Sequence, residues 1–126
     1  QQYLVIKKMT ESLKLNTRII CVKTVRDRNG LPLSSRNSYL SGQEFKIAIK
    51  INKLLKKLPP LIRTKLKINK ILNHTKKVLI DHGVDKIDYL TVLNDDLSVR
   101  KKISDKSRIF IAAKIGNTRL IDNIKI

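Results

Sequence analysis

Two hydroxyl side chains followed by a guanidinium form the part of this sequence best suited to chemistry. Ser34, Ser35 and Arg36 stand in a loop close to the expected start of a helix. Hydroxyl and backbone N–H groups can donate to phosphate oxygens, and a guanidinium can bind them through two parallel hydrogen bonds. A helix N-terminus adds partial positive charge. These residues suit an anion site, but taken alone they are more often a capping turn without a ligand.

The residues on both sides of this triplet predict a turn and then a helix. Asn29-Gly30 is a turn signal within a polar stretch that covers residues 23–40. Ser41, with Glu44 three residues later, has the pattern of a capping box. The apolar stripe of the helix that follows consists of Ile47, Ile51, Leu54, Leu55 and Leu58. We expect Pro59-Pro60 to end this helix.

The rest of the chain predicts one more helix and a small sheet. The helix covers about residues 65–82 and ends before Gly83. Three strand-like runs follow at Lys86–Leu93, Arg108–Lys114 and Thr118–Ile126. A tight connection at Lys114–Asn117 predicts a hairpin between the last two. The predicted fold class is therefore α+β, with two main helices packed on an antiparallel sheet of about three strands.

Alternation in the first of these runs predicts which side chains share a face of the sheet. Ile87, Tyr89 and Thr91 alternate with Asp88 and Leu90. Because successive side chains of a strand point to opposite faces, we expect the first three on one face and the other two on the opposite face.

The first 24 residues have a different pattern from the rest. Apolar residues recur at helical spacing over residues 2–14, and residues 17–22 are β-branched and apolar, which predicts a buried strand. A helix followed by such a strand is typical of the end of an α/β unit. The single cysteine, Cys21, is predicted to be a small core residue of that strand. Since one strand cannot form a sheet alone, we expect its partner strands upstream of Gln1, and the lack of an initial Met agrees with an upstream start.

Charge and composition leave two function classes open. The 126 residues carry a formal net charge of +18, which suits either a nucleic-acid binder or a basic enzyme that handles anions. Aromatic residues make up only 4% and Trp is absent, so base-stacking platforms are few. The lysines are spread along the whole chain, which makes nucleic acid the less favoured partner. No apolar run is long enough to span a membrane, and a single Cys is typical of a reducing, cytoplasmic protein.

Two long motifs resemble those of one enzyme family. Thr24-Val25-Arg26, Asn29-Gly30-Leu31 and residues 33–41 together resemble the signature of the pantothenate synthetases (pantoate–β-alanine ligases). Residues 112–123, Ala-Ala-Lys-Ile-Gly-Asn-Thr-Arg-Leu-Ile-Asp-Asn, resemble that family's closing motif. Gln1-Gln2 is similar to a Gln pair near the end of its nucleotide-binding domain. The resemblance runs in order over the whole chain.

This resemblance implies a domain division and a reaction. Residues 1–24 would be the last helix and strand of a Rossmann-like nucleotide-binding domain, and residues 25–126 would be the complete C-terminal domain. The family's reaction uses ATP: pantoate forms pantoyl adenylate and pyrophosphate, and β-alanine then attacks the adenylate to give pantothenate and AMP. The implied ligands are ATP, with Mg²⁺ carried by its phosphates, pantoate and β-alanine. The full-length enzyme would be a homodimer that also contains the missing N-terminal domain.

The resemblance also assigns roles to individual residues. Ser34, Ser35 and Arg36 would contact the ATP phosphates in a catalytic loop that stabilises charge moving onto pyrophosphate. Val25 and Leu33 would bind ATP through main-chain or apolar contact. Gln2 would hydrogen-bond pantoate.

Other polar residues are expected to be structural or at the surface. Arg119, Asp122 and Asn123 are predicted to hold the domain together. We expect His74 and His82 at the surface, and no metal-ligand set stands out in the sequence.

The sequence departs from the family pattern in several places. Asn29 replaces a usual Asp, Lys23 replaces a common Pro, and Pro32 replaces a small residue and removes one N–H donor. The family's H-x-G-H and Gly-x-Lys-Asp segments are absent from these 126 residues. We therefore expect the isolated chain to be inactive. The alternative is a small basic nucleic-acid-binding domain without catalysis.

Overall fold

The computed structural model describes residues 1–64, 67–94, 103–104 and 106–126. Its elements, in chain order, are α1 (Gln2–Ser12), the 3₁₀ helix η1 (Ser35–Tyr39), α2 (Gly42–Leu55), α3 (Leu58–Arg63), α4 (Ile68–Asp81), β1 (Lys86–Leu93), β2 (Arg108–Ile115) and β3 (Thr118–Lys125). No helix in these ranges is long and apolar enough to cross a membrane.

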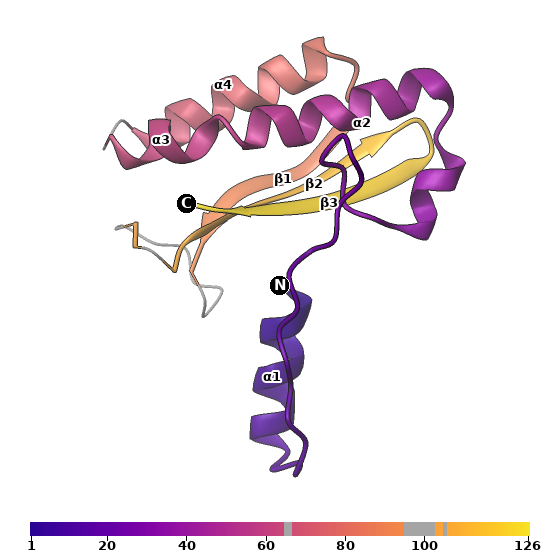
Figure 1. The fold of residues 1–126 in the computed structure, drawn as a ribbon. Helices are drawn as coiled ribbons and strands as arrows, with labels where there is room; N and C mark the ends of the chain where they lie inside the picture. The colour runs from indigo at the N-terminus through magenta and orange to yellow at the C-terminus, as the bar shows by residue number, and fades with distance from the viewer. Residues whose placement is uncertain (65–66, 95–102, 105) are drawn as a thin grey trace.

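The three strands form an antiparallel sheet with β2 in the centre. Helices α2, α3 and α4 all lie over one face of this sheet (Figure 1). The predicted α+β class is confirmed, and β1 has the predicted bounds. Ile115 pairs with Thr118 across the turn between β2 and β3, which confirms the predicted hairpin.

The hydrophobic core lies between the helices and the central strand. Alternate residues of β2 enter it: Ile109, Ile111, Ala113 and Ile115. The helices contribute Ala48, Ile51, Leu55, Leu58, Ile62, Leu72 and Leu79. Leu31 also belongs to this core and is only 4% exposed, although it lies in the loop before η1. The loop is therefore anchored in the core by an apolar side chain.

The predicted alternation of side chains in β1 is wrong at its beginning. The register between β1 and β2 shifts between Ile87 and Tyr89, so Asp88 is a bulge residue. Ile87 consequently packs against the core together with Leu90, while Tyr89 pairs with Ala112 on the opposite face. The extra residue of a bulge shifts the side chains on one side of it to the other face of the sheet. A prediction from strict alternation does not include such a shift.

The predicted stop of the first main helix is also wrong. Helix α2 ends at Leu55, and Pro59-Pro60 lie in the first turn of α3. Proline is tolerated there because the N–H groups of a first turn have no partner within the helix. The second predicted helix is α4; residues 65 and 66 of its predicted range lie outside the described residues.

The N-terminal part confirms one prediction and overturns two. Helix α1 is present, but residues 17–22 form no strand, and Cys21 is exposed rather than a core residue. A strand needs a neighbour to satisfy its N–H and C=O groups, and none of the described strands pairs with this segment. Figure 1 shows α1 and the segment after it projecting away from the helices and the sheet.

Candidate functional site

The predicted triplet forms the beginning of η1. Ser34 caps this helix: its Oγ accepts from the N–H of Arg36 at 3.2 Å, and its carbonyl accepts from the N–H of Asn37 at 3.0 Å. The capping turn expected from the sequence is therefore present. Ser34, Ser35 and Arg36 are all exposed, and in the described part of the chain the Arg36 guanidinium has no hydrogen-bond or ion-pair partner. Three groups that can bind an anion thus face solvent.

A short backbone ladder joins residues 25–27 to residues 31–33 within the Ser-Ser-Arg loop, which comprises residues 25–37. Arg26 and Pro32 form an antiparallel bridge. It is flanked by bonds from the N–H of Asp27 to the carbonyl of Leu31, at 2.9 Å, and from the N–H of Leu33 to the carbonyl of Val25, at 3.0 Å. The bridge brings Val25 and Leu33 side by side, and both side chains are largely exposed.

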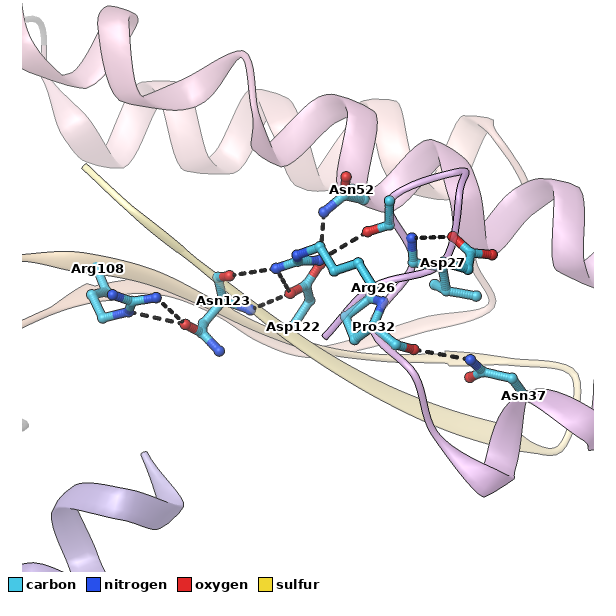
Figure 2. Close-up of polar contacts among 10 residues, drawn as sticks. Arg26, Asp27, Pro32, Asn37, Asn52, Arg108, Asp122 and Asn123 are labelled. Carbon is cyan, nitrogen blue, oxygen red and sulfur yellow. Dashed lines mark hydrogen bonds and ion pairs between the residues drawn. The ribbon is translucent and has the colours of Figure 1, made fainter. Parts of the chain in front are cut away.

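This ladder explains how Pro32 is accommodated. The hydrogen bonds of the bridge come from the residues beside the Arg26–Pro32 pair, so no ladder bond requires an N–H at position 32. The Pro32 carbonyl accepts from the Asn37 side-chain amide at 2.9 Å (Figure 2). Pro32 therefore stiffens the loop without removing a bond within it.

The turn at the tip of the loop is organised by Asp27. Its Oδ1 accepts from the N–H of Asn29 at 2.9 Å and from the N–H of Leu31 at 2.8 Å. Gly30 has a positive φ of 87°. An Asp side chain that binds the backbone two residues later is a common way to fix such a turn. The predicted turn is confirmed, and Asn29 is compatible with it. Lys23 is exposed, and nothing in the structure explains its departure from the family pattern.

The side chain of Arg26 connects this loop to β3. Its two terminal nitrogens donate to both carboxylate oxygens of Asp122, at 2.9 and 2.8 Å. They also donate to the carbonyl of Gly30 at 2.9 Å and to the carbonyl of Asn123 at 3.0 Å. Asn52 of α2 donates to Asp122 Oδ2 at 3.1 Å (Figure 2). One cluster therefore joins the loop, the edge strand and a core helix.

The other polar residues of the closing motif also have partners within the domain. Arg119 donates to Asp88 Oδ2 at 2.7 Å, and this hydrogen bond lowers the pKa of Asp88 below its ordinary value. Asn123 Oδ1 accepts from Arg108 at 2.9 and 2.7 Å. These contacts agree with the predicted structural role of Arg119, Asp122 and Asn123.

Gln2 lies apart from the Ser-Ser-Arg loop. It is exposed in the first turn of α1, and no hydrogen bond joins it to the loop within the described ranges. Its neighbour Gln1 accepts from the hydroxyl of Tyr89 in β1 at 3.3 Å. The structure therefore brings Val25 and Leu33 close to the triplet but does not bring Gln2 there.

Comparison with known proteins identifies the family. A profile described as Pantoate-beta-alanine ligase matches residues 1–125. The chain belongs to the pantoate–β-alanine ligase family. Pantothenate synthetase from Bradyrhizobium sp. is 38% identical over 128 residues, which cover 100% of this chain and 45% of that protein. The enzyme from Endomicrobium trichonymphae is 41% identical over 98% of this chain and 44% of its own length.

Solved ligases have the same fold over this region. Pantothenate synthetase from Thermus thermophilus superposes with a TM-score of 0.87 at 28% identity, over 98% of this chain and 45% of its own. The pantoate–β-alanine ligase from Francisella tularensis, complexed with beta-gamma ATP and β-alanine, superposes with a TM-score of 0.70 at 31% identity. The superposition covers 98% of this chain and 39% of that ligase. The chain thus spans less than half the length of these relatives.

The described residues of this ligase-family chain offer an exposed loop rather than an enclosed nucleotide pocket. The cavity beneath the loop, lined in part by Pro32 and Asp122, holds about 10 Å³, which is room for about one water. Sites for ligands of nucleotide size occupy roughly 300 Å³ or more. No group of three metal-ligating side chains occurs in the described ranges, and His74 and His82 are exposed as predicted.

A second surface carries some of the positive charge. Lys50, Lys53 and Lys57 of the α2 region and His82 after α4 line a groove of about 180 Å³. The nucleic-acid alternative would place phosphates here. No Phe, Tyr or Trp lines the groove, so the only ring there on which a base could stack is the imidazole of His82.

Sequence reasoning missed three residues that shape the site: Arg26, Asp27 and Asn52. Arg26 belongs to the first family motif and Asp122 to the closing motif. Their opposite charges were a signal that the two motifs could be in contact. Asp27, three residues before Gly30, has the spacing of a turn-forming Asp. Asn52 lies within an apolar helix stripe, and a buried amide among leucines and isoleucines implies a polar partner.

Proposed function

We propose that this chain supplies the triphosphate-binding part of an enzyme that joins pantoate and β-alanine. The carrying observation is that Ser34, Ser35 and Arg36 stand exposed on a loop anchored to the sheet, in a chain of the pantoate–β-alanine ligase family. The Francisella relative, solved with beta-gamma ATP and β-alanine, supports ATP and β-alanine as ligands.

The reaction proceeds in two steps. A carboxylate oxygen of pantoate attacks the α-phosphorus of ATP, and the bond to the β-phosphate breaks, so that negative charge grows on pyrophosphate. The hydroxyls of Ser34 and Ser35 and the guanidinium of Arg36 donate to the β- and γ-phosphate oxygens and stabilise that charge. The amine of β-alanine then attacks the acyl carbon of pantoyl adenylate, and AMP leaves.

Val25 and Leu33 flank the phosphates and contact the nucleotide. The N–H of Leu33 already donates to the carbonyl of Val25, so these residues offer ATP their exposed side chains and their remaining backbone groups. Mg²⁺ arrives with ATP and is held mainly by its phosphates.

The remaining half of the site belongs to a nucleotide-binding domain. We assign residues 1–24 to that domain and residues 25–126 to the C-terminal domain. Support comes from apolar side chains that residues 1–24 leave exposed: Val5, Met9, Leu13, Leu15, Ile20 and Val22. A soluble domain rarely leaves so much apolar surface uncovered. Gln2 would bind pantoate on that side. The complete enzyme is proposed to be a cytoplasmic homodimer.

The decisive test compares two arginines of the same loop in the full-length ligase that contains this chain. Arg36→Ala should raise the activation free energy of adenylate formation by about 2.7–4 kcal/mol, which slows this step about 10²–10³-fold. This is the usual loss for one preorganised charge-stabilising donor. Arg28→Ala removes the same charge from an exposed position in the loop and should have little effect. Pyrophosphate release in single turnovers measures the step directly.

Three results would contradict the proposal. One is an unchanged rate of pyrophosphate release in Arg36→Ala. The second is an equal loss in both variants, which would indicate a general effect of charge. The third is pantothenate formation by the 126-residue chain alone from ATP, pantoate and β-alanine. Submicromolar binding of DNA or RNA that weakens steeply with salt would favour the nucleic-acid alternative instead.

A further inference from the structure

The cluster around Asp122 is the most heavily hydrogen-bonded feature near the Ser-Ser-Arg loop. Arg26 donates four hydrogen bonds of 2.8–3.0 Å, two of them to the carboxylate of Asp122. The side chains of Arg26 and Asp122 are only 23% and 6% exposed. Paired, charged hydrogen bonds of this geometry are among the strongest and most directional in proteins.

Asp122 is itself held in place from two sides. Its Oδ2 accepts from the Asn52 amide at 3.1 Å, and its Oδ1 accepts from the N–H of Asn123 at 2.6 Å. Asn52 lies in α2 and is 1% exposed, so the carboxylate is fixed relative to the core and not only to its own strand. Asp122 is therefore a rigid anchor for the Arg26 guanidinium.

The connection between the Arg26–Asp122 pair and the two serines is short. Arg26 pairs with Pro32, the carbonyl of Pro32 accepts from Asn37 in η1, and only Leu33 stands between the bridge and Ser34. The triplet itself makes only local bonds within η1 and its cap. The position of these three residues on the domain is thus set by the bonds of Arg26 and Asn37, by the buried side chain of Leu31, and by the packing of η1 on β3 and of Leu40 on the core.

We propose that Asp122, acting through Arg26, is a positioning residue that holds Ser34, Ser35 and Arg36 in the geometry that binds the triphosphate. This inference rests on the proposed function, because it concerns the same loop. The sheet does not need the ion pair: β3 is paired with β2 along its whole length, from Thr118 to Lys125. Loss of the pair loosens the loop and leaves the sheet in place.

The test uses the ¹⁵N-labelled full-length ligase that contains this chain, and four variants of it. Asp122→Asn keeps the shape but removes the charge, and Arg26→Lys keeps the charge but removes the two-pronged geometry. Ile62→Val is a matched control that weakens the core in α3, where Ile62 is 1% exposed. Arg36→Ala removes the ligand contact without touching the anchor. Two readouts are taken on each protein: backbone order parameters of residues 33–37, and MgATP affinity from chemical-shift titration.

The expected result separates anchoring from general stability. In the wild type, order parameters of the loop should be close to those of rigid backbone, about 0.85, and in both anchor variants they should fall below about 0.6. MgATP affinity should fall about tenfold or more in the anchor variants, since small displacements of positioning groups have large effects. Ile62→Val should lower the Tm but leave loop order and affinity unchanged, and cross-strand NOEs between β2 and β3 should show the same strand pairing in all.

Each failure has a distinct meaning. Wild-type order in the loop of Asp122→Asn and Arg26→Lys would overturn the positioning role, as would an affinity loss no larger than that of Ile62→Val. If the wild type binds no MgATP at the loop, or Arg36→Ala binds it as tightly as the wild type, the proposed function fails. The order parameters still decide the positioning role in that case, because they are measured without a ligand.

Discussion

The side-chain oxygen of Asn52 lies where a side chain at position 30 would have to begin. A β-carbon added to Gly30 would stand 2.6 Å from Asn52 Oδ1, well inside van der Waals contact. The Asn52 amide cannot simply turn around, because its Nδ2 donates to the carboxylate of Asp122 at 3.1 Å. Gly30 also has a φ of 87°, a conformation that residues with a side chain rarely adopt. The turn of the Ser-Ser-Arg loop therefore requires glycine for two independent reasons.

Gly30→Ala should destabilise the domain by about 2 kcal/mol or more, because the left-handed conformation alone costs roughly 1–2 kcal/mol and the clash adds to it. Gly42→Ala is the control: Gly42 lies in the first turn of α2 with nothing within 4 Å of an added β-carbon. That change should be neutral or stabilising by up to about 1 kcal/mol. Urea unfolding compares them. Equal effects would contradict the assignment of strain to position 30.

Removal of the buried carboxylate should weaken the fold more than removal of an exposed one. Asp122→Ala leaves the Arg26 guanidinium and the Asn52 amide without their shared partner, and breaking such a pair costs about 3 kcal/mol. Asp88→Ala, which removes the partner of Arg119 at the surface, should have a far smaller effect. Denaturant midpoints of the two variants give the comparison. A similar loss in both would mean that burial does not strengthen the Arg26–Asp122 pair.

Local patterns in the sequence predict the helices and strands well, and contacts between distant segments poorly. The strand Lys86–Leu93 and the capping box at Ser41 and Glu44 follow from periodicity and spacing, and both are present. Residues 17–22 have the composition of a strand but lack a described strand to pair with. The bulge at Asp88 breaks a period of two, which a pattern of alternation cannot show.

In the candidate site, too, local features can be predicted from the sequence and contacts between distant segments cannot. Ser34, Ser35 and Arg36 can be found from the motif that they form, and their exposure agrees with a role in ligand binding. The contact between Arg26 and Asp122 joins residues 96 positions apart. Only the fold brings these two motifs together, so their joint action on the loop could not be predicted from either motif alone.

The Asp88–Arg119 pair should make stability sensitive to strongly acidic pH. The hydrogen bond from Arg119 is the largest cause that lowers the pKa of Asp88 below its ordinary value of 3.8. A carboxyl with a lowered pKa in the folded state contributes stability above the unfolded pKa, and this contribution disappears as the pH falls through the folded value. Its loss therefore begins below about pH 3.8, the ordinary value.

An NMR titration of the Asp88 carboxyl carbon checks this directly. In Arg119→Gln, the pKa of Asp88 should rise back towards 3.8 because the principal hydrogen bond is gone. Lys86→Gln should raise the pKa less, since Lys86 acts only through its charge and is a smaller cause. If the carboxyl titrates at the same pH in wild type and Arg119→Gln, the assigned cause is incorrect.

The beginning of α2 and the turn between β2 and β3 are coupled through Glu44. Its Oε2 accepts from the N–H of Ser41 at 2.7 Å, which completes the capping box, while Ser41 Oγ accepts from the N–H of Glu44 at 3.3 Å. A β-carbon added to Gly116 would overlap Glu44 Oε1. Gly116 is fixed in turn because its N–H donates to Asp85 Oδ2 at 2.6 Å. A side chain at position 116 must therefore displace the Glu44 carboxylate.

A double-mutant cycle tests this coupling. Gly116→Ala should destabilise the domain through its positive φ of 54° and through the loss of a capping interaction of about 1 kcal/mol. Glu44→Ala removes the same interaction and also the clash, so the double variant should be more stable than the sum of the single effects by about 0.5–1 kcal/mol. Urea unfolding of the four proteins gives the coupling energy. Additivity within about 0.3 kcal/mol would show that the hairpin turn and the helix cap are independent.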